Sequence, residues 1–223
     1  MKTKLLLNAL VKFTAGLLMV GLILFLPAGT LNYPGGWRFC ALLFLPMLIL
    51  GTVLFCKAPD LLEKRLASKE KETEQKQVIG LSLLMFVGGF VVAGLDFRFG
   101  WSGLPGWVVN AASVVLLVSY GLYAEVMREN AYLSRTVEVQ EGQKVVDTGL
   151  YGIVRHPMYM ATTILFLSIP LVLGSLPAFV IFLIYPVLLV KRIKNEEAVL
   201  ADGLPGYREY MEKVQYRMIP FIW

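Results

Sequence analysis

Long apolar runs are the feature that most constrains how this chain can fold. Four runs are each closed by proline, glycine or charge: Leu5 to Leu26, Trp37 to Phe55, Val78 to Leu95 and Trp107 to about Met127. A helix needs about 20 mainly apolar residues to cross the hydrocarbon core of a bilayer. Because 57% of the 223 residues are hydrophobic, the runs predict an integral membrane protein and not one large soluble core. No small-residue cleavage site follows the first run, so we expect it to be a retained helix.

The pattern changes after the fourth run. Residues 128–155 form a polar stretch, and two shorter apolar segments follow it, Met158 to Leu173 and Leu176 to Val190, separated by Gly174-Ser175. Glycine and serine are typical turn residues. The two segments therefore predict a tight helical hairpin whose arms are short for crossing a membrane at right angles.

These elements together predict an all-α fold. We expect a polytopic transmembrane bundle with about six spans, the last two forming the short hairpin, in which Pro170 and Pro186 bend the helices. The chain divides into an N-terminal four-helix membrane region, residues 1–127, and a C-terminal region, residues 128–223, within one integrated domain. The C-terminal region holds the polar groups that can carry chemistry.

Basic residues predict the orientation in the membrane. In a six-span topology only Arg38 and Arg98 flank the loops on one side, and the other lysines and arginines fall on the opposite side. The positive-inside rule then places both termini, the 128–155 segment and any site built from it in the cytoplasm. The net charge of +5 is explained by contact with anionic membrane lipids and does not require a nucleic acid partner.

The run Arg155-His156-Pro157-Met158-Tyr159 holds the only histidine of the chain. Proline suits the first turn of a helix because the N–H that it lacks would be unpaired there, so we expect a helix to begin at Pro157 with His156 as its cap or pre-cap residue. Taken alone, the run is better explained by a helix end at the membrane surface, with Arg155 near lipid phosphate, His156 as a cap and Tyr159 in the interfacial aromatic belt.

A second polar cluster follows the second arm of the hairpin and includes Arg192, Glu196 and Glu197. The hairpin brings this cluster back to the depth of His156, so the two clusters predict a polar pocket open to both water and lipid. We predict no metal site, because one histidine and no pair of cysteines at ligand spacing are present.

Three runs carry a family resemblance: G-L-Y-G-I-V-R-H-P-M-Y at 149–159, R-I-K-N-E-E at 192–197 and G-L-P-G-Y-R-E-Y at 203–210. They resemble the isoprenylcysteine carboxyl methyltransferase family, which is itself similar to the phospholipid N-methyltransferases. The resemblance covers about residues 137–222. It implies a helical membrane enzyme that binds S-adenosyl-L-methionine in a cytoplasmic pocket and receives a lipophilic acceptor from the bilayer.

The same resemblance assigns roles to individual residues. The positions that match cofactor-binding segments of the family are Gln140, Gln143, Lys144, Val145, Val146, Tyr151, His156, Pro157, Met158, Tyr159 and Glu196. Arg192 matches an arginine assigned to the substrate. A carboxylate acceptor is already nucleophilic and needs only orientation, by Arg192 or Arg155, whereas an amine acceptor needs deprotonation, for which Glu197 or His156 is available. Both O-methyl and N-methyl transfer therefore remain open.

Two other classes of function are compatible with the sequence. Some membrane sterol reductases resemble the family in their C-terminal helices, so an NADPH-dependent reductase is the enzymatic alternative. A helical membrane scaffold without a ligand is the other alternative, in which both polar clusters contact lipid headgroups. Binding of S-adenosylmethionine separates the methyltransferase from the other two classes.

Overall fold

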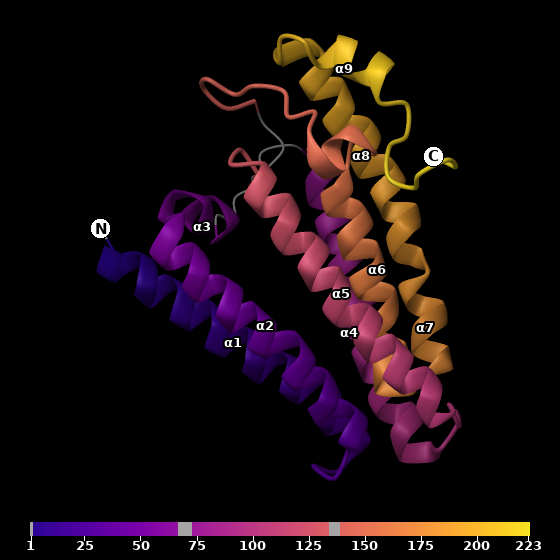
Figure 1. Ribbon diagram of the computed structural model, residues 1–223. Coiled ribbons are helices and arrows are strands. Elements are labelled where there is room, and N and C mark those ends of the chain that lie inside the picture. The colour runs from indigo at the N-terminus through magenta and orange to yellow at the C-terminus, as the bar shows by residue number, and fades with distance from the viewer. Residues whose placement is uncertain (1, 67–72, 134–138) are drawn as a thin grey trace.

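The computed structural model describes residues 2–66, 73–133 and 139–223 (Figure 1). The N-terminal half forms α1 (Lys2–Ala28), α2 (Pro34–Lys57), α3 (Pro59–Leu66), α4 (Thr73–Phe99) and α5 (Gly106–Glu129). The C-terminal half forms the short 3₁₀ helix η1 (Gly149–Gly152), α6 (Pro157–Leu173), α7 (Leu176–Phe182), α8 (Ile184–Gly203) and α9 (Tyr207–Lys213). The described residues contain helices and no strands, which confirms the predicted all-α class.

Five helical segments are long and apolar enough to cross a membrane. They are Thr3–Ala28, Pro34–Lys57, Gln77–Phe99, Gly106–Glu129 and Leu176–Gly203. The 17-residue helix α6 is a shorter apolar helix beside them. This arrangement confirms a polytopic helical membrane protein.

The predicted hairpin is confirmed at its start and at its turn. Helix α6 begins at Pro157 with His156 as the N-cap residue. It ends at Gly174, whose φ of 82° is in the left-handed region that glycine adopts without strain. Ser175 then caps α7, because its side-chain oxygen accepts a hydrogen bond from the N–H of Ala178.

The second arm of the hairpin is longer as a helix than its apolar segment. Helices α7 and α8 form one 28-residue candidate span, Leu176–Gly203, interrupted at Leu183. The interruption lies just before Pro186, which has no N–H to donate to the carbonyl of Phe182. Helix α8 continues beyond the apolar segment through Arg192, Glu196 and Glu197, which places these side chains on a regular helix.

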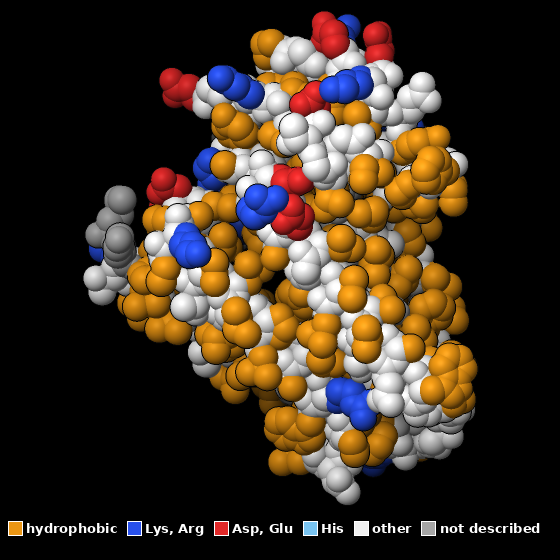
Figure 2. Space-filling view, viewed as in Figure 1, with side chains coloured by type: hydrophobic (Ala, Val, Ile, Leu, Met, Phe, Trp, Pro, Cys, Tyr) orange, Lys and Arg blue, Asp and Glu red, His pale blue; other side chains and the backbone are white. Residues whose placement is uncertain are grey.

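The bundle has a charged end and an apolar end. The N-terminus, α3, α9 and the C-terminus lie toward one end, and the turn between α4 and α5 lies at the other (Figure 1). Charged side chains gather over the first end, whereas hydrophobic side chains cover most of the visible face below it (Figure 2). The described helices thus bring most basic groups to one end; that this end is cytoplasmic stays a prediction.

At the apolar end, polar contacts join the turns. The two carboxylate oxygens of buried Asp96 accept hydrogen bonds from the backbone N–H and the hydroxyl of Ser102, each at 2.7 Å. The Ser102 hydroxyl oxygen in turn accepts a hydrogen bond from the N–H of Leu176. The buried Tyr33 hydroxyl donates to the carbonyl of Leu173 at 2.8 Å. These bonds tie the hairpin to the N-terminal helices.

Close packing of α1 against α4 depends on Gly94. A Cβ atom at this position would lie 2.5 Å from the carbonyl oxygen of Leu24 and 3.0 Å from the backbone nitrogen of Ala28. Both atoms belong to the backbone of α1, so a side chain at residue 94 can be accommodated only if the two helices separate. Small residues at such contacts let membrane helices approach closely.

We expect Gly94→Ala to lower the stability of the bundle by about 1–3 kcal/mol, the usual cost of overpacking. Gly88→Ala is the matched control, because Gly88 lies on the same helix and no atom lies within 4 Å of a Cβ there. The control should be neutral or slightly stabilising, since alanine favours a helix more than glycine does. Thermal unfolding in detergent measures both; equal melting temperatures would contradict the close contact.

Candidate active site

The start of α6 is held by the C-terminal tail of the chain. The backbone N–H of Arg155 donates to the carbonyl of Tyr216 at 2.9 Å, and that of His156 donates to the carbonyl of Arg217 at 2.7 Å. The Arg155 guanidinium donates further hydrogen bonds to the carbonyls of Val214 (2.6 Å) and Gln215 (3.0 Å). The tail therefore fixes the backbone and one side chain of the motif.

Glu197 is the centre of a buried charged network. Its Oε1 atom accepts a hydrogen bond from Nε of Arg155 at 2.7 Å and lies 3.3 Å from Nε2 of His156. Its Oε2 atom accepts a hydrogen bond from Nε of Arg217 at 2.8 Å. Arg155, His156 and Glu197 are 6%, 5% and 4% exposed, so the buried charges of Arg155 and Glu197 depend on each other for compensation. A carboxylate only accepts, so Nε2 of His156 carries the proton in this contact.

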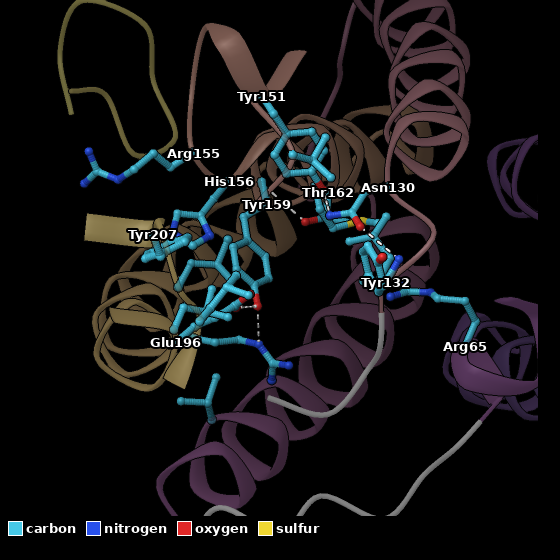
Figure 3. Close-up of a pocket in the computed structure, with 18 of the residues that line it drawn as sticks. Arg65, Asn130, Tyr132, Tyr151, Arg155, His156, Tyr159, Thr162, Glu196 and Tyr207 are labelled. Atoms are coloured by element: carbon cyan, nitrogen blue, oxygen red, sulfur yellow. Dashed lines mark hydrogen bonds between the residues drawn. The ribbon is translucent and has the colours of Figure 1, made fainter. Parts of the chain in front are cut away.

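Glu196, one residue earlier, belongs to a different cluster. Its Oε2 atom accepts a hydrogen bond from the hydroxyl of Tyr159, and this hydroxyl also accepts a hydrogen bond from Nε of Arg192 at 2.8 Å. The rings of His156 and Tyr159 stack, with their centroids 5.6 Å apart. Tyr159 thus joins the motif at the start of α6 to the polar end of α8 (Figure 3).

Helix η1 positions Tyr151 next to these clusters. Gly149 has a φ of 52°, and a Cβ atom there would collide with the carboxylate of Glu129, which accepts a hydrogen bond from the N–H of Leu150. The Tyr151 hydroxyl accepts a hydrogen bond from Nδ2 of Asn130 at 3.0 Å. Burial is the main cause that raises the pKa of Tyr151, so its hydroxyl stays neutral.

The clusters line a pocket of about 510 Å³, which is within the range of small-molecule sites. One wall is polar and comes from the segment after η1, the start of α6 and the end of α8. The other wall is apolar and comes from α4, α6 and α8, including Val78, Leu83, Phe86, Phe166 and Leu189. The pocket thus connects polar groups at the charged end with membrane-spanning helices.

The structure brings most of the predicted residues into this pocket. Those that line it are Gln143, Lys144, Val145, Val146, Tyr151, Arg155, His156, Met158, Tyr159, Arg192 and Glu196. Gln140, Pro157 and Glu197 are not among the described lining residues. Gln140 instead shapes the turn before Gln143, whose side-chain oxygen accepts a hydrogen bond from the Gln140 N–H. All the predicted binding roles stay predictions.

The geometry bears on the roles predicted for Arg155 and Glu197. The guanidinium of Arg155 is engaged by Glu197 and by two tail carbonyls, so it favours a positioning role over direct contact with an acceptor. The Glu197 carboxylate is likewise engaged, by Arg155 and Arg217. Arg192 and Glu196 are the members of the second cluster that line the pocket.

Several residues that line the pocket were not predicted from the sequence. Arg65 reaches it from α3 and donates a hydrogen bond to the hydroxyl of Tyr123. Asn130, Tyr207 and Tyr210 also line it. Tyr207 and Tyr210 lie in the run at 203–210 that carries the family resemblance. Their place in that run was a sequence signal that they could belong to the site. The apolar residues of α4 could not be assigned to the pocket from the sequence, because a uniformly apolar run does not show which face of the helix lines a pocket.

The fold and the site together define a polytopic helical membrane protein with a partly polar, partly apolar pocket at its charged end. Residues 109–202 match the family model of the isoprenylcysteine carboxyl methyltransferase (ICMT) family. This stretch contains most of α5, the Arg155 to Tyr159 motif, the hairpin and nearly all of α8, including Glu196 and Glu197. The match confirms the family resemblance predicted from the sequence.

A curated protein is similar to part of the same chain. Delta(14)-sterol reductase TM7SF2 from Mus musculus is 32% identical over 91 residues, which are 40% of this chain and 22% of the reductase. The chain thus matches only about a fifth of that relative's length.

Proposed function

We propose that this protein is an integral membrane methyltransferase that uses S-adenosyl-L-methionine and methylates a lipophilic acceptor. The observation that carries the proposal is the pocket itself. It places the cluster of Tyr159, Arg192 and Glu196 next to apolar walls from α4 and α8. The ICMT-family match over residues 109–202 supports the same reaction.

The residues of the pocket fit the proposed cofactor in size and in chemistry. A volume of about 510 Å³ suits a ligand of this size. Glu196 offers a carboxylate for the methionine ammonium or the ribose hydroxyls, and Val145, Leu200 and Leu204 offer apolar contact for the base. When bound, S-adenosylmethionine supplies an electrophilic methyl group on a sulfonium.

The chain's own part in the reaction is orientation and exclusion of water. Tyr159 holds Glu196 and Arg192 in one arrangement through its hydroxyl, so a group bound by Glu196 and a group bound by Arg192 meet in fixed geometry. Orientation of this kind can lower a barrier by about 7–11 kcal/mol. The apolar wall from α4 keeps water away from the transferred group. Arg192 would orient a carboxylate acceptor without any general base.

Binding of the demethylated product, S-adenosylhomocysteine, tests the proposal. We expect the detergent-purified protein to bind it in a calorimetric titration, and Glu196→Gln to weaken binding about 10- to 100-fold, because a hydrogen bond to a charged group contributes about 1.5–3 kcal/mol. Glu209→Gln is the matched control, since Glu209 is an exposed carboxylate on α9 outside the described pocket lining. It should bind as the unaltered protein does.

The same titration separates the alternatives. Binding of NADPH in place of S-adenosylhomocysteine would favour a reductase, the activity that the name of the mouse relative states. Binding of neither compound would favour the scaffold. Equal affinity of Glu196→Gln and the unaltered protein would contradict the site assignment.

A further inference from the structure

Tyr207, the first residue of α9, carries a buried hydroxyl that has no hydrogen-bond partner within residues 2–66, 73–133 and 139–223. The side chain is 5% exposed. Buried polar groups in proteins almost always have a hydrogen-bond partner, and one without a partner destabilises the fold. A group of this kind therefore needs an explanation.

Tyr210, on the same helix, is a buried tyrosine whose hydroxyl does have a hydrogen-bond partner. It is also 5% exposed, but its hydroxyl donates to the carbonyl of Tyr151 at 2.7 Å. The two rings are in contact, with their centroids 5.6 Å apart. Tyr207 differs from Tyr210 in its direction: it lies beside His156 and Glu196 at the pocket (Figure 3).

The surroundings of Tyr207 indicate the kind of ligand group that meets it. Tyr207 and Leu204 belong to one apolar cluster against which Val145 and Leu200 pack, and all four line the pocket. His156 lies beside Tyr207 (Figure 3). The guanidinium of Arg155, which is nearby, is already engaged by Glu197. The pocket around Tyr207 thus offers apolar contact and one unpaired hydroxyl, which suits a flat heterocyclic base better than a carboxylate or an ammonium group.

The Tyr207 hydroxyl also keeps its proton. Burial, together with the nearby carboxylates of Glu196 and Glu197, raises the pKa of Tyr207 well above its usual value. The neutral hydroxyl can donate one hydrogen bond and accept another. Glu196 and Tyr207 line the same pocket, so a ligand whose base meets Tyr207 can present its sugar to the Glu196 carboxylate.

We infer that the Tyr207 hydroxyl forms a hydrogen bond with the adenosine part of the bound methyl donor and so helps to select an adenosine ligand. The inference rests on the proposed function, because it assumes that the pocket holds this donor. The ligand supplies the partner that the described protein residues do not.

Two tyrosine-to-phenylalanine variants test this role by calorimetry and thermal unfolding in detergent. The probes are S-adenosylhomocysteine and 5′-methylthioadenosine, which has the adenosine part but no amino acid part. Tyr207→Phe should weaken both by a similar factor of about three to ten, the loss of one neutral hydrogen bond. Its melting temperature without ligand should equal or exceed that of the unaltered protein, because a buried unpaired hydroxyl has been removed.

Tyr33→Phe is the matched control. The Tyr33 hydroxyl is buried and bonded to Leu173 at the apolar end, so this variant should lower the melting temperature and leave both affinities unchanged. A lower melting temperature with unchanged affinities for Tyr207→Phe would overturn the inference, and so would weaker binding of S-adenosylhomocysteine alone. If the unaltered protein binds neither probe, the proposed function fails as well; if it binds both and Tyr207→Phe binds them equally well, only the inference fails.

Discussion

Replacing Glu197 by alanine is expected to destabilise the protein by about 3–5 kcal/mol, because removal of one partner leaves a buried charge without compensation. Arg155 is 6% exposed and would lose the carboxylate at 2.7 Å. Arg217 would lose its 2.8 Å partner as well. The loss should appear as a large fall in melting temperature in detergent and as weaker binding of S-adenosylhomocysteine, because His156 loses a buried contact at the pocket.

Two further variants separate this network from a general effect of charge. Glu212→Ala removes an exposed carboxylate from α9 and should change stability by less than about 0.5 kcal/mol. Combining Arg155→Met with Glu197→Ala should cost less than the sum of the single changes, because the buried guanidinium is then gone too. An unaltered melting temperature of Glu197→Ala would contradict the network.

The second large effect is expected at Arg192. Arg192→Leu should lower methyl transfer about 10²- to 10³-fold, the usual loss when a positioned electrostatic group is removed from an active site. Binding of S-adenosylhomocysteine should change less than the transfer rate, because Glu196 and Tyr159 remain. The measurement is transfer of labelled methyl groups from S-adenosylmethionine to a lipid extract by protein in detergent.

Lys191→Leu is the matched control for this experiment. Lys191 precedes Arg192 on α8, and its exposed ammonium group bonds to Gln77 outside the described lining of the pocket. The Lys191→Leu variant should transfer methyl groups at the same rate as the unaltered protein. Equal rates for Arg192→Leu and Lys191→Leu would show that Arg192 does not orient the acceptor.

Much of the fold could be predicted from local patterns. Hydropathy and length located the spans, since a bilayer imposes a minimum helix length. Pro157 and Gly174 marked the start and the end of α6, because proline lacks an N–H and glycine tolerates a positive φ. Hydropathy located only the apolar part of the second arm, whereas α8 continues through the charged residues to Gly203.

The site could be predicted only in part. The sequence brought His156 and the Glu196-Glu197 pair together, but it could not show which carboxylate faces the pocket. Adjacent helical residues point about 100° apart, so packing decides, and it places Glu196 at the pocket and Glu197 in the buried network. The hydrogen bond between Arg155 and the tail joins residues 59 positions apart. A contact at this separation cannot be predicted from a local sequence pattern.

That pairing also sets the order in which the protein can mature during synthesis. Arg155 leaves the ribosome 59 residues before the carbonyl of Val214 that binds it, which is about 3–12 s at 5–20 residues per second. Glu197 is synthesised 42 residues after Arg155, so its carboxylate becomes available to the guanidinium before the carbonyls of the tail do. The backbone and guanidinium contacts that fix the start of α6 can therefore form only after the tail has been synthesised.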